Sequence, residues 1–235
     1  MTTDLIVPEK NLVPSTECPF SDEITGFDVE EIPLSIAKIH HDRGRFFIDP
    51  SNKDYEKLLG WILAAAKSRI RWAEEEAEIL CRSLDAQISE EGKDCMTCPH
   101  AKWIDGDRPA CSTVCNLLVL MQDDADACLF RCARTAYLAA KNYVMALVKQ
   151  RRPLYSVVTE ISLEPRESKF GKMYFVPKFK RLKDITDKND LLMLRDAFEY
   201  FAPKFSALRV EVEIEGEEEE SKAESADDTN SDLPF

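Results

Sequence analysis

Four cysteines within 21 residues constrain the middle of this 235-residue chain more than any other feature. In the segment CMTCPHAKWIDGDRPACSTVC, Cys95 and Cys98 form one close pair, and Cys111 and Cys115 form another after a twelve-residue gap. Two such pairs on separate turns can direct four thiolates at one tetrahedral Zn²⁺. Residues 91–115 have little regular pattern of their own. We therefore predict a loop folded around a structural zinc ion held by these four side chains.

The fourth zinc ligand has alternatives to the last cysteine of this segment. His100 can replace one thiolate, and Cys128 with Cys132 forms a further pair that the site can recruit. For Cys128 and Cys132 we favour ordinary burial, because a free cysteine packs as a small hydrophobic side chain. A redox role for the first pair is disfavoured, because a thioredoxin-like motif lies between a strand and a helix, whereas this pair lies in a loop.

The N-terminus and the apolar runs indicate the compartment. MTTDLIVPEK has no basic start followed by an apolar stretch, so it is not a secretory signal. No apolar run approaches the roughly 18 residues that a membrane-spanning helix needs. We expect a cytoplasmic protein, in which closely spaced cysteines bind metal more often than they form disulfides. Cys18 and Cys81 carry no signal beyond that of buried cysteines.

Charge is strongly segregated along the chain. The net charge of −13 arises mainly from residues 211–235, which hold eleven acids against one lysine. Residues 131–210 instead carry 17 bases and 8 acids, a net charge of +9. A basic face attracts phosphate, and a tethered acidic tail can compete for it. We expect the tail to be disordered, because a segment of this composition cannot bury itself.

Local patterns predict a mixed α+β domain over residues 31–210, preceded by an extended arm at 1–30. Apolar residues at three- and four-residue steps predict a long helix within 53–90 as a helical insertion, and 93–116 is the expected zinc loop. The other predicted elements are strands at 32–40, 44–49 and 116–121, a helix at 133–152, a hairpin of strands at 154–163 and 170–182, a helix at 188–202, and a strand beginning near 207. Five or six strands with substantial helix fit a small barrel with insertions.

The predicted hairpin interleaves basic and aromatic residues. Single-stranded nucleic acid needs a basic groove for its phosphates and exposed rings on which unpaired bases stack. Part of the aromatic set is expected to be core, but a structural hairpin has no need of six bases in the sixteen residues SKFGKMYFVPKFKRLK. The candidate nucleic-acid-binding residues are Arg45, Phe47, Lys141, Arg151, Arg152, Tyr155, Lys169, Phe170, Lys172, Tyr174, Phe175, Lys178, Phe179, Lys180 and Arg181.

No catalytic constellation competes with a binding role. The seven glycines do not form a phosphate-binding spacing, and two of the three histidines are adjacent on a predicted strand. The sequence has no nucleophile elbow, and its scattered carboxylates indicate surface positions more than paired acid-base chemistry. We therefore expect a protein that is not an enzyme.

The acidic C-terminus ends in Asp232, Leu233, Pro234 and Phe235. This tip resembles, position by position, that of bacterial single-stranded-DNA-binding proteins, which end in aspartates followed by Ile-Pro-Phe or a similar sequence; here leucine replaces isoleucine. The resemblance implies a partner-binding tip. A terminal ring beside a terminal carboxylate suits an apolar pocket next to a basic residue.

Within residues 93–182, Cys95, Cys98, Pro99, Trp103 and Cys111 are followed by NLLVLM, a helix and SVVTEISL. In this pattern the segment is similar to phage and mobile-element single-stranded-DNA-binding proteins with an oligonucleotide-binding (OB) fold and a zinc loop. This resemblance implies an OB-fold-like β-barrel that coats single-stranded DNA during replication or recombination in a bacterial host cell or nucleoid. It also implies a structural zinc ion and recruitment of replication or recombination proteins. The alternative is a zinc-dependent adaptor or transcription factor that contacts RNA polymerase or duplex DNA.

Overall fold

The computed structural model describes residues 34–73, 79–104, 106, 108–123, 126–168 and 171–207. The predicted arm, the acidic tail and the strand expected near 207 lie outside the described residues. So do six of the candidate site residues, namely Lys169, Phe170, Asp232, Leu233, Pro234 and Phe235.

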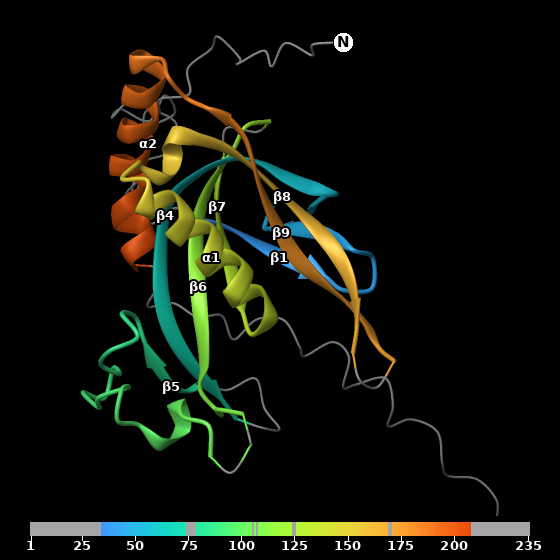
Figure 1. The fold of residues 1–235 in the computed structure, drawn as a ribbon, viewed down its shortest axis with the longest axis vertical. Helices are drawn as coiled ribbons and strands as arrows, with labels where there is room; N and C mark the ends of the chain where they lie inside the picture. The colour runs from blue at the N-terminus through green and yellow to red at the C-terminus, as the bar shows by residue number, and fades with distance from the viewer. Residues whose placement is uncertain are drawn as a thin grey trace, which may run out of the picture.

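The described part forms one mixed sheet, strongly curled into a half-barrel, with two helices (Figure 1). The strand order is β3-β2-β1-β7-β6-β4-β8-β9, and β5 pairs with β4. Only the β1–β7 pair is parallel among the described strands. The elements are β1 (Ser35–His40), β2 (Arg45–Asp49), β3 (Lys53–Tyr55), β4 (Lys57–Trp72), β5 (Ile79–Ser83), β6 (Ser112–Met121), β7 (Ala127–Ala133), α1 (Thr135–Lys149), β8 (Val157–Glu167), β9 (Met173–Asp184) and α2 (Lys188–Ala207).

The helix predicted within 53–90 is wrong, because these residues form β3, β4 and β5. β4 is a central strand that pairs with β6 and β8, and both of its faces are covered. Leu58 and Ile62 pack on the face beneath α1, whereas Trp61 and Leu63 pack on the face beneath α2. A strand buried on both faces has a nearly continuous apolar run, and such a run also satisfies a helical stripe.

Two apolar layers hold the helices on opposite faces of the sheet. On one face, Leu117 and Phe130 pack with Ala140 of α1. On the other, Leu118 and Leu129 pack in the same cluster as Leu194 of α2. Burial of apolar surface in these two layers fixes α1 and α2 against the central strands, because hydrophobic stabilisation follows the apolar area removed from water.

Several predicted elements are confirmed. The first two strands, the buried strand, the hairpin and both shorter helices appear as β1, β2, β6, β8–β9, α1 and α2. β7 had not been predicted, although the expected burial of Cys128 and Cys132 is confirmed, since both are fully buried on that strand. Neither described helix combines the length and the apolar character that crossing a bilayer requires.

The two ends of the curled sheet approach each other at the turn between β1 and β2. The Phe175 backbone N–H of β9 donates a hydrogen bond to His41 Nδ1 at 3.1 Å. A Cβ atom added to Gly44 would lie 2.5 Å from the Phe175 ring, so this turn needs glycine both for its close approach and for its positive φ of 63°. Phe175 therefore links the last strand to the first hairpin.

Candidate functional site

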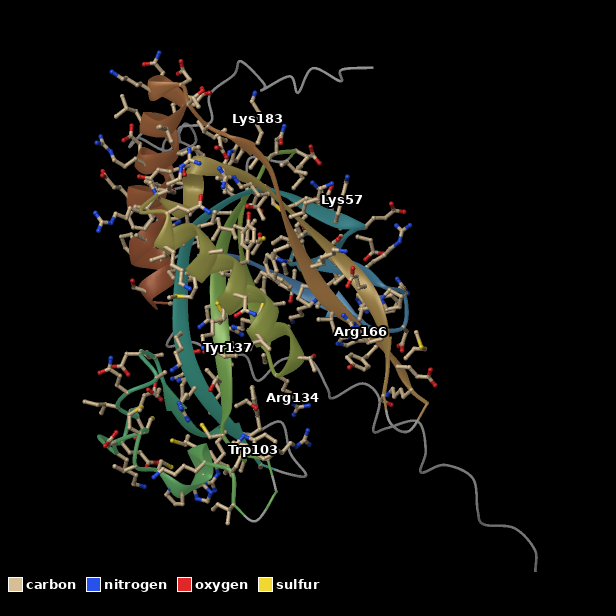
Figure 2. All side chains as sticks on the ribbon, in the orientation of Figure 1. Lys57, Trp103, Arg134, Tyr137, Arg166 and Lys183 are labelled. Carbon is tan, nitrogen blue, oxygen red and sulfur yellow. The ribbon has the colours of Figure 1, made fainter. Side chains whose placement is uncertain are left out.

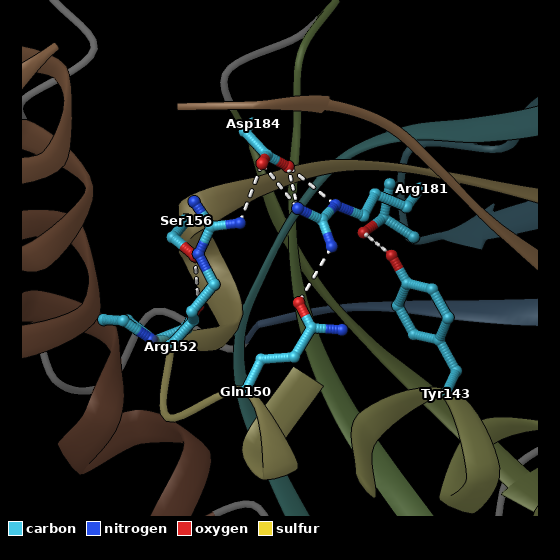
Figure 3. A network of polar contacts seen from close by, with 8 residues as sticks. Tyr143, Gln150, Arg152, Ser156, Arg181 and Asp184 are labelled. Atoms are coloured by element: carbon cyan, nitrogen blue, oxygen red, sulfur yellow. Dashed lines mark hydrogen bonds and ion pairs between the residues drawn. The ribbon is translucent and has the colours of Figure 1, made fainter. Parts of the chain in front are cut away.

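A cluster of two arginines and one aspartate joins the end of α1 to the end of β9 (Figure 3). Arg181 Nε donates to Asp184 Oδ1 at 2.6 Å, and Arg152 Nη1 donates to Asp184 Oδ2 at 2.7 Å. Arg181 also donates to the Gln150 side-chain oxygen at 2.9 Å. Hydrogen bonds from Arg181 and then Arg152 lower the pKa of Asp184. Two cations share one carboxylate, so the cluster keeps one uncompensated positive charge.

The chain places this cluster through a short connection after α1. Residues 154–156 form a 3-10 turn, and the Ile185 N–H donates to the Ser156 carbonyl at 2.9 Å, which holds the end of β9 beside that turn. Deeper in the same region, Tyr143 and Thr159 share a hydrogen bond of 2.7 Å between their hydroxyls, and the Tyr143 ring stacks on Phe179. Phe179 is thus part of the packing beneath α1 and not a free stacking surface.

A cavity of about 430 Å³ lies beside the cluster, between the 3-10 turn and α2. Its size falls within the usual range of ligand sites. The Tyr155 ring stacks on Phe198 of α2 with 6.4 Å between ring centroids, which fixes the orientation of this wall. We call this cavity the basic pocket, lined by Arg152, Pro153, Tyr155, Ser156, Ile185, Lys188, Leu191, Leu192 and Arg195. Three of the nine lining residues are basic and none is acidic.

The α2 side of the basic pocket combines charge with apolar surface. Lys188, Leu191, Leu192 and Arg195 follow helical spacing, so they share one face of α2. The helix begins with the Asp187 carboxylate accepting the backbone N–H groups of residues 189 and 190. Arg195 forms ion pairs with Asp196 at 3.5 Å and with Glu199 at 3.4 Å on its own helix. Lys188 makes no ion pair with any described residue. The helix dipole disfavours a cation at this end, so helix stability does not explain Lys188.

The outer face of the β8–β9 hairpin is less basic than its sequence predicts. Lys178 forms an ion pair with Glu164, and Arg166 lies 3.7 Å from the same carboxylate. Lys172 and Lys180 are exposed and form no ion pair within the described part of the chain. Tyr174 is half-buried, so its ring is only partly available.

The remaining predicted residues lie away from the basic pocket lining. Arg45 forms an ion pair with Glu56 at 3.2 Å, and the Phe47 ring lies edge-on against His40. The Lys141 ammonium lies 6.0 Å from the centre of the Tyr137 ring. Arg151 is exposed beside Arg152 at the end of α1.

The structure therefore brings together three of the predicted residues, Arg152, Tyr155 and Arg181, with Arg151 as a close sequence neighbour. Sequence reasoning had missed Asp184, Lys188 and Arg195. Lys188 and Arg195 could have been found from the helical spacing that places them on one face with two leucines. Asp184 could have been found as an acidic residue at the end of the basic hairpin.

Cys115 had been expected to bind zinc with Cys95, Cys98 and Cys111. It lies instead in the hydrophobic core with Cys128 and Cys132. Cys115 lies on β6 directly opposite Cys132 in the core beneath α1, and burial raises its pKa to about 11. Cys111 lies one residue before β6, and four residues of extended chain span about 13 Å. These two cysteines cannot both bind one tetrahedral ion without breaking the strand. As the side chains stand, no three histidine, cysteine, aspartate or glutamate residues of the described part form a metal-binding group.

Comparison with known proteins assigns no family to this chain. No protein-family model matches the sequence. No curated protein and no solved structure matches it either. The function therefore has to be inferred from the chemistry of the site itself.

Proposed function

We propose that this protein binds single-stranded DNA without strong sequence preference and serves DNA replication or recombination. The observation that carries the proposal is the basic pocket, whose lining has three cations, an aromatic wall and no acid in a chain of net charge −13. Unpaired bases need an apolar or aromatic surface and their phosphates need cations, and one cavity supplies both. This role requires no catalytic group.

Each part of the basic pocket has a defined task in this proposal. Lys188 and Arg195 contact phosphates, while an unpaired base enters against Tyr155 and the two leucines of α2. A base held within a duplex cannot enter, because it is stacked and paired. Lys183 extends the cationic surface from β9 toward the α2 end of the molecule, where Figure 2 shows it.

The Arg152–Arg181–Asp184 cluster supports the basic pocket from behind. Arg152 belongs both to this cluster and to the pocket lining, so Asp184 fixes the direction of its guanidinium. The second arginine keeps the net charge positive. A preorganised arginine loses less conformational entropy when it binds phosphate than a freely rotating side chain does.

The proposal includes an OB-fold-like barrel and a regulatory tail. The strong curl of the sheet and the contact of Phe175 with the β1–β2 turn support a barrel. The acidic residues 211–235 would compete with DNA for the basic surface and, when displaced, present the tip ending in Phe235 to replication or recombination proteins.

A titration with fluorescent oligo-dT and with a duplex of the same length, at two salt concentrations, tests the proposal. We expect tight, salt-sensitive binding to the single strand and weak binding to the duplex. An oligo-U of equal length tests discrimination against RNA. Preferential binding to the duplex, or binding to neither DNA, would overturn the proposal and favour the adaptor that contacts polymerase or duplex DNA.

Removal of residues 211–235 tests the role of the tail. Because the tail carries a net charge of −10, its loss should tighten binding to oligo-dT at low salt and have less effect at high salt. Equal affinities of the full-length and truncated proteins at low salt would contradict competition by the tail, even if the pocket binds DNA.

A further inference from the structure

The segment between β5 and β6, residues 84–111, has almost no hydrophobic core of its own. We call it the cysteine excursion. It extends from the lower end of the sheet in Figure 1. Among its described residues only Ala86, Ser89 and Cys95 are buried, whereas Trp103 is 70% exposed. Loops of this length without a core are uncommon unless another interaction holds them. A cross-link would explain why the segment folds.

Backbone hydrogen bonds fix the chain around three cysteines of this excursion. The Cys95 N–H donates to the Gln87 carbonyl at 2.7 Å, and the Cys111 N–H donates to the His100 carbonyl at 2.8 Å. The turn that starts at Cys98 is closed by a hydrogen bond from the Ala101 N–H to the Cys98 carbonyl. The turn that follows Cys98 is thereby tied to Cys111, which directly precedes β6.

Strand register adds Cys81 to the same neighbourhood. On β5, Cys81 lies opposite Arg71 of β4. On the other side of β4, Ile70 lies opposite Ser112 of β6. Because β4 and β6 are antiparallel, the next residue of β4, Arg71, is flanked by the residue before Ser112, which is Cys111. Residues opposite one another on neighbouring strands point to the same face of the sheet. Cys81 and Cys111 therefore project from the same face, on either side of one arginine.

Arg69 supplies a further sign of an anionic group at this place. Its Nε is buried and has no hydrogen-bond partner in the described part of the chain. Arg69 is on β4 opposite Ser83 of β5 and Thr113 of β6, two residues from the position flanked by Cys81 and Cys111. A thiolate is an acceptor for such an N–H, and positive charge stabilises several thiolates held together.

We propose that Cys81, Cys95, Cys98 and Cys111 bind one structural Zn²⁺ as a tetrahedral four-thiolate site, with Cys81 in the place that sequence spacing had given to Cys115. Binding releases one proton from each thiol to solvent and involves no electron transfer, because Zn²⁺ is not redox-active. The ion draws the four side chains to a common centre and cross-links the excursion to β5 and β6. Arg69 and Arg71 offset part of the negative charge of the site.

Matched serine variants test the ligand assignment by metal content and affinity. Full-length wild-type protein and the control Cys115→Ser should each retain one zinc per chain after gel filtration. Cys81→Ser should lose the ion, or bind it more than about 100-fold more weakly in competition with a chelator, beyond the effect of an outer-shell change. When Cys81→Ser is saturated with Co²⁺, the thiolate-to-metal charge-transfer absorption should be about a quarter lower than in the wild-type protein, because one of four thiolate ligands is lost. Wild-type zinc affinity in Cys81→Ser would overturn the assignment.

A second measurement uses only the wild-type protein, so it stands even if a variant misfolds. Iodoacetamide labelling with and without a chelator, read by mass spectrometry, identifies the thiols that the metal protects. Chelation should raise the labelling of Cys81, Cys95, Cys98 and Cys111 together, whereas Cys115 stays unreactive in the core. Purified protein without zinc that also fails to bind added zinc, or protection of Cys115 in place of Cys81, would refute the site.

Discussion

Replacement of Lys188 by alanine separates DNA binding from folding. Lys188 is exposed at the first turn of α2, lines the basic pocket and forms no ion pair with a described residue. A cation at a helix N-terminus opposes the helix dipole, so its removal should leave stability unchanged or raise it by about 0.3–1 kcal/mol. Any loss of DNA affinity in Lys188→Ala would therefore not arise from unfolding.

The size of the effect follows from counterion release. One phosphate contact on a single strand contributes about 0.7 to the slope of log affinity against log salt concentration. Loss of that contact should weaken oligo-dT binding about 8-fold at about 50 mM salt and about 3-fold at about 200 mM. The ratio of the wild-type affinity for oligo-dT to that of the variant should therefore become about 2.6-fold smaller between these two salt concentrations.

Fluorescence anisotropy over a series of salt concentrations measures this slope, and Lys102→Ala is the matched control. Lys102 is also exposed and also contributes one positive charge, but it lies on the cysteine excursion. We expect the control to keep the wild-type slope, apart from a small effect of net charge. An unchanged slope in Lys188→Ala, or an equal change in both variants, would refute phosphate binding at the pocket.

Two further predictions concern stability, and urea unfolding followed by circular dichroism measures both. A Cβ atom on Gly60 would lie 1.9 Å from the Leu120 carbonyl oxygen, so Gly60→Ala should destabilise the fold by at least about 2–3 kcal/mol; a loss below about 1 kcal/mol would contradict this packing. Hydrogen bonds from Arg181, the larger cause, and from Arg152 lower the pKa of Asp184 below its usual 3.8. The stability that this carboxylate contributes is therefore fully present above pH 3.8 and is lost as the pH falls through the lower pKa of the folded state. Asp184→Asn should therefore be less stable than wild type at pH 7 but differ little at about pH 2, and a difference that grows on acidification would exclude this linkage.

Local patterns in the sequence determined much of the fold. Two strand-like runs joined by a polar loop predicted β8 and β9, and the apolar face of residues 133–152 predicted α1. These elements could be recognised because their sequence patterns are local and only one periodicity fits them. In the same way, charge counting located a basic region that contains Arg152 and Tyr155 of the basic pocket.

The sequence did not determine how β4 is covered. Its apolar run satisfies the spacing of a helix as well as that of a strand buried on two faces. The choice depends on α1 and α2, which lie far along the chain and cover opposite faces of the sheet. Propensity and periodicity are weak evidence where tertiary packing supplies most of the stabilisation.

The sequence by itself determined which chemical groups this protein has, namely a basic half, an acidic tail and a cysteine-rich segment. Only the tertiary structure decided which of these groups meet. It joined Arg181 to Asp184 by a hydrogen bond and packed Phe179 against Tyr143 of α1. It also placed Cys81 opposite Arg71, on the side of β4 away from Cys111. The physical reason is that strand register and helix packing join residues far apart in the chain, and spacing along the sequence carries no information about such contacts.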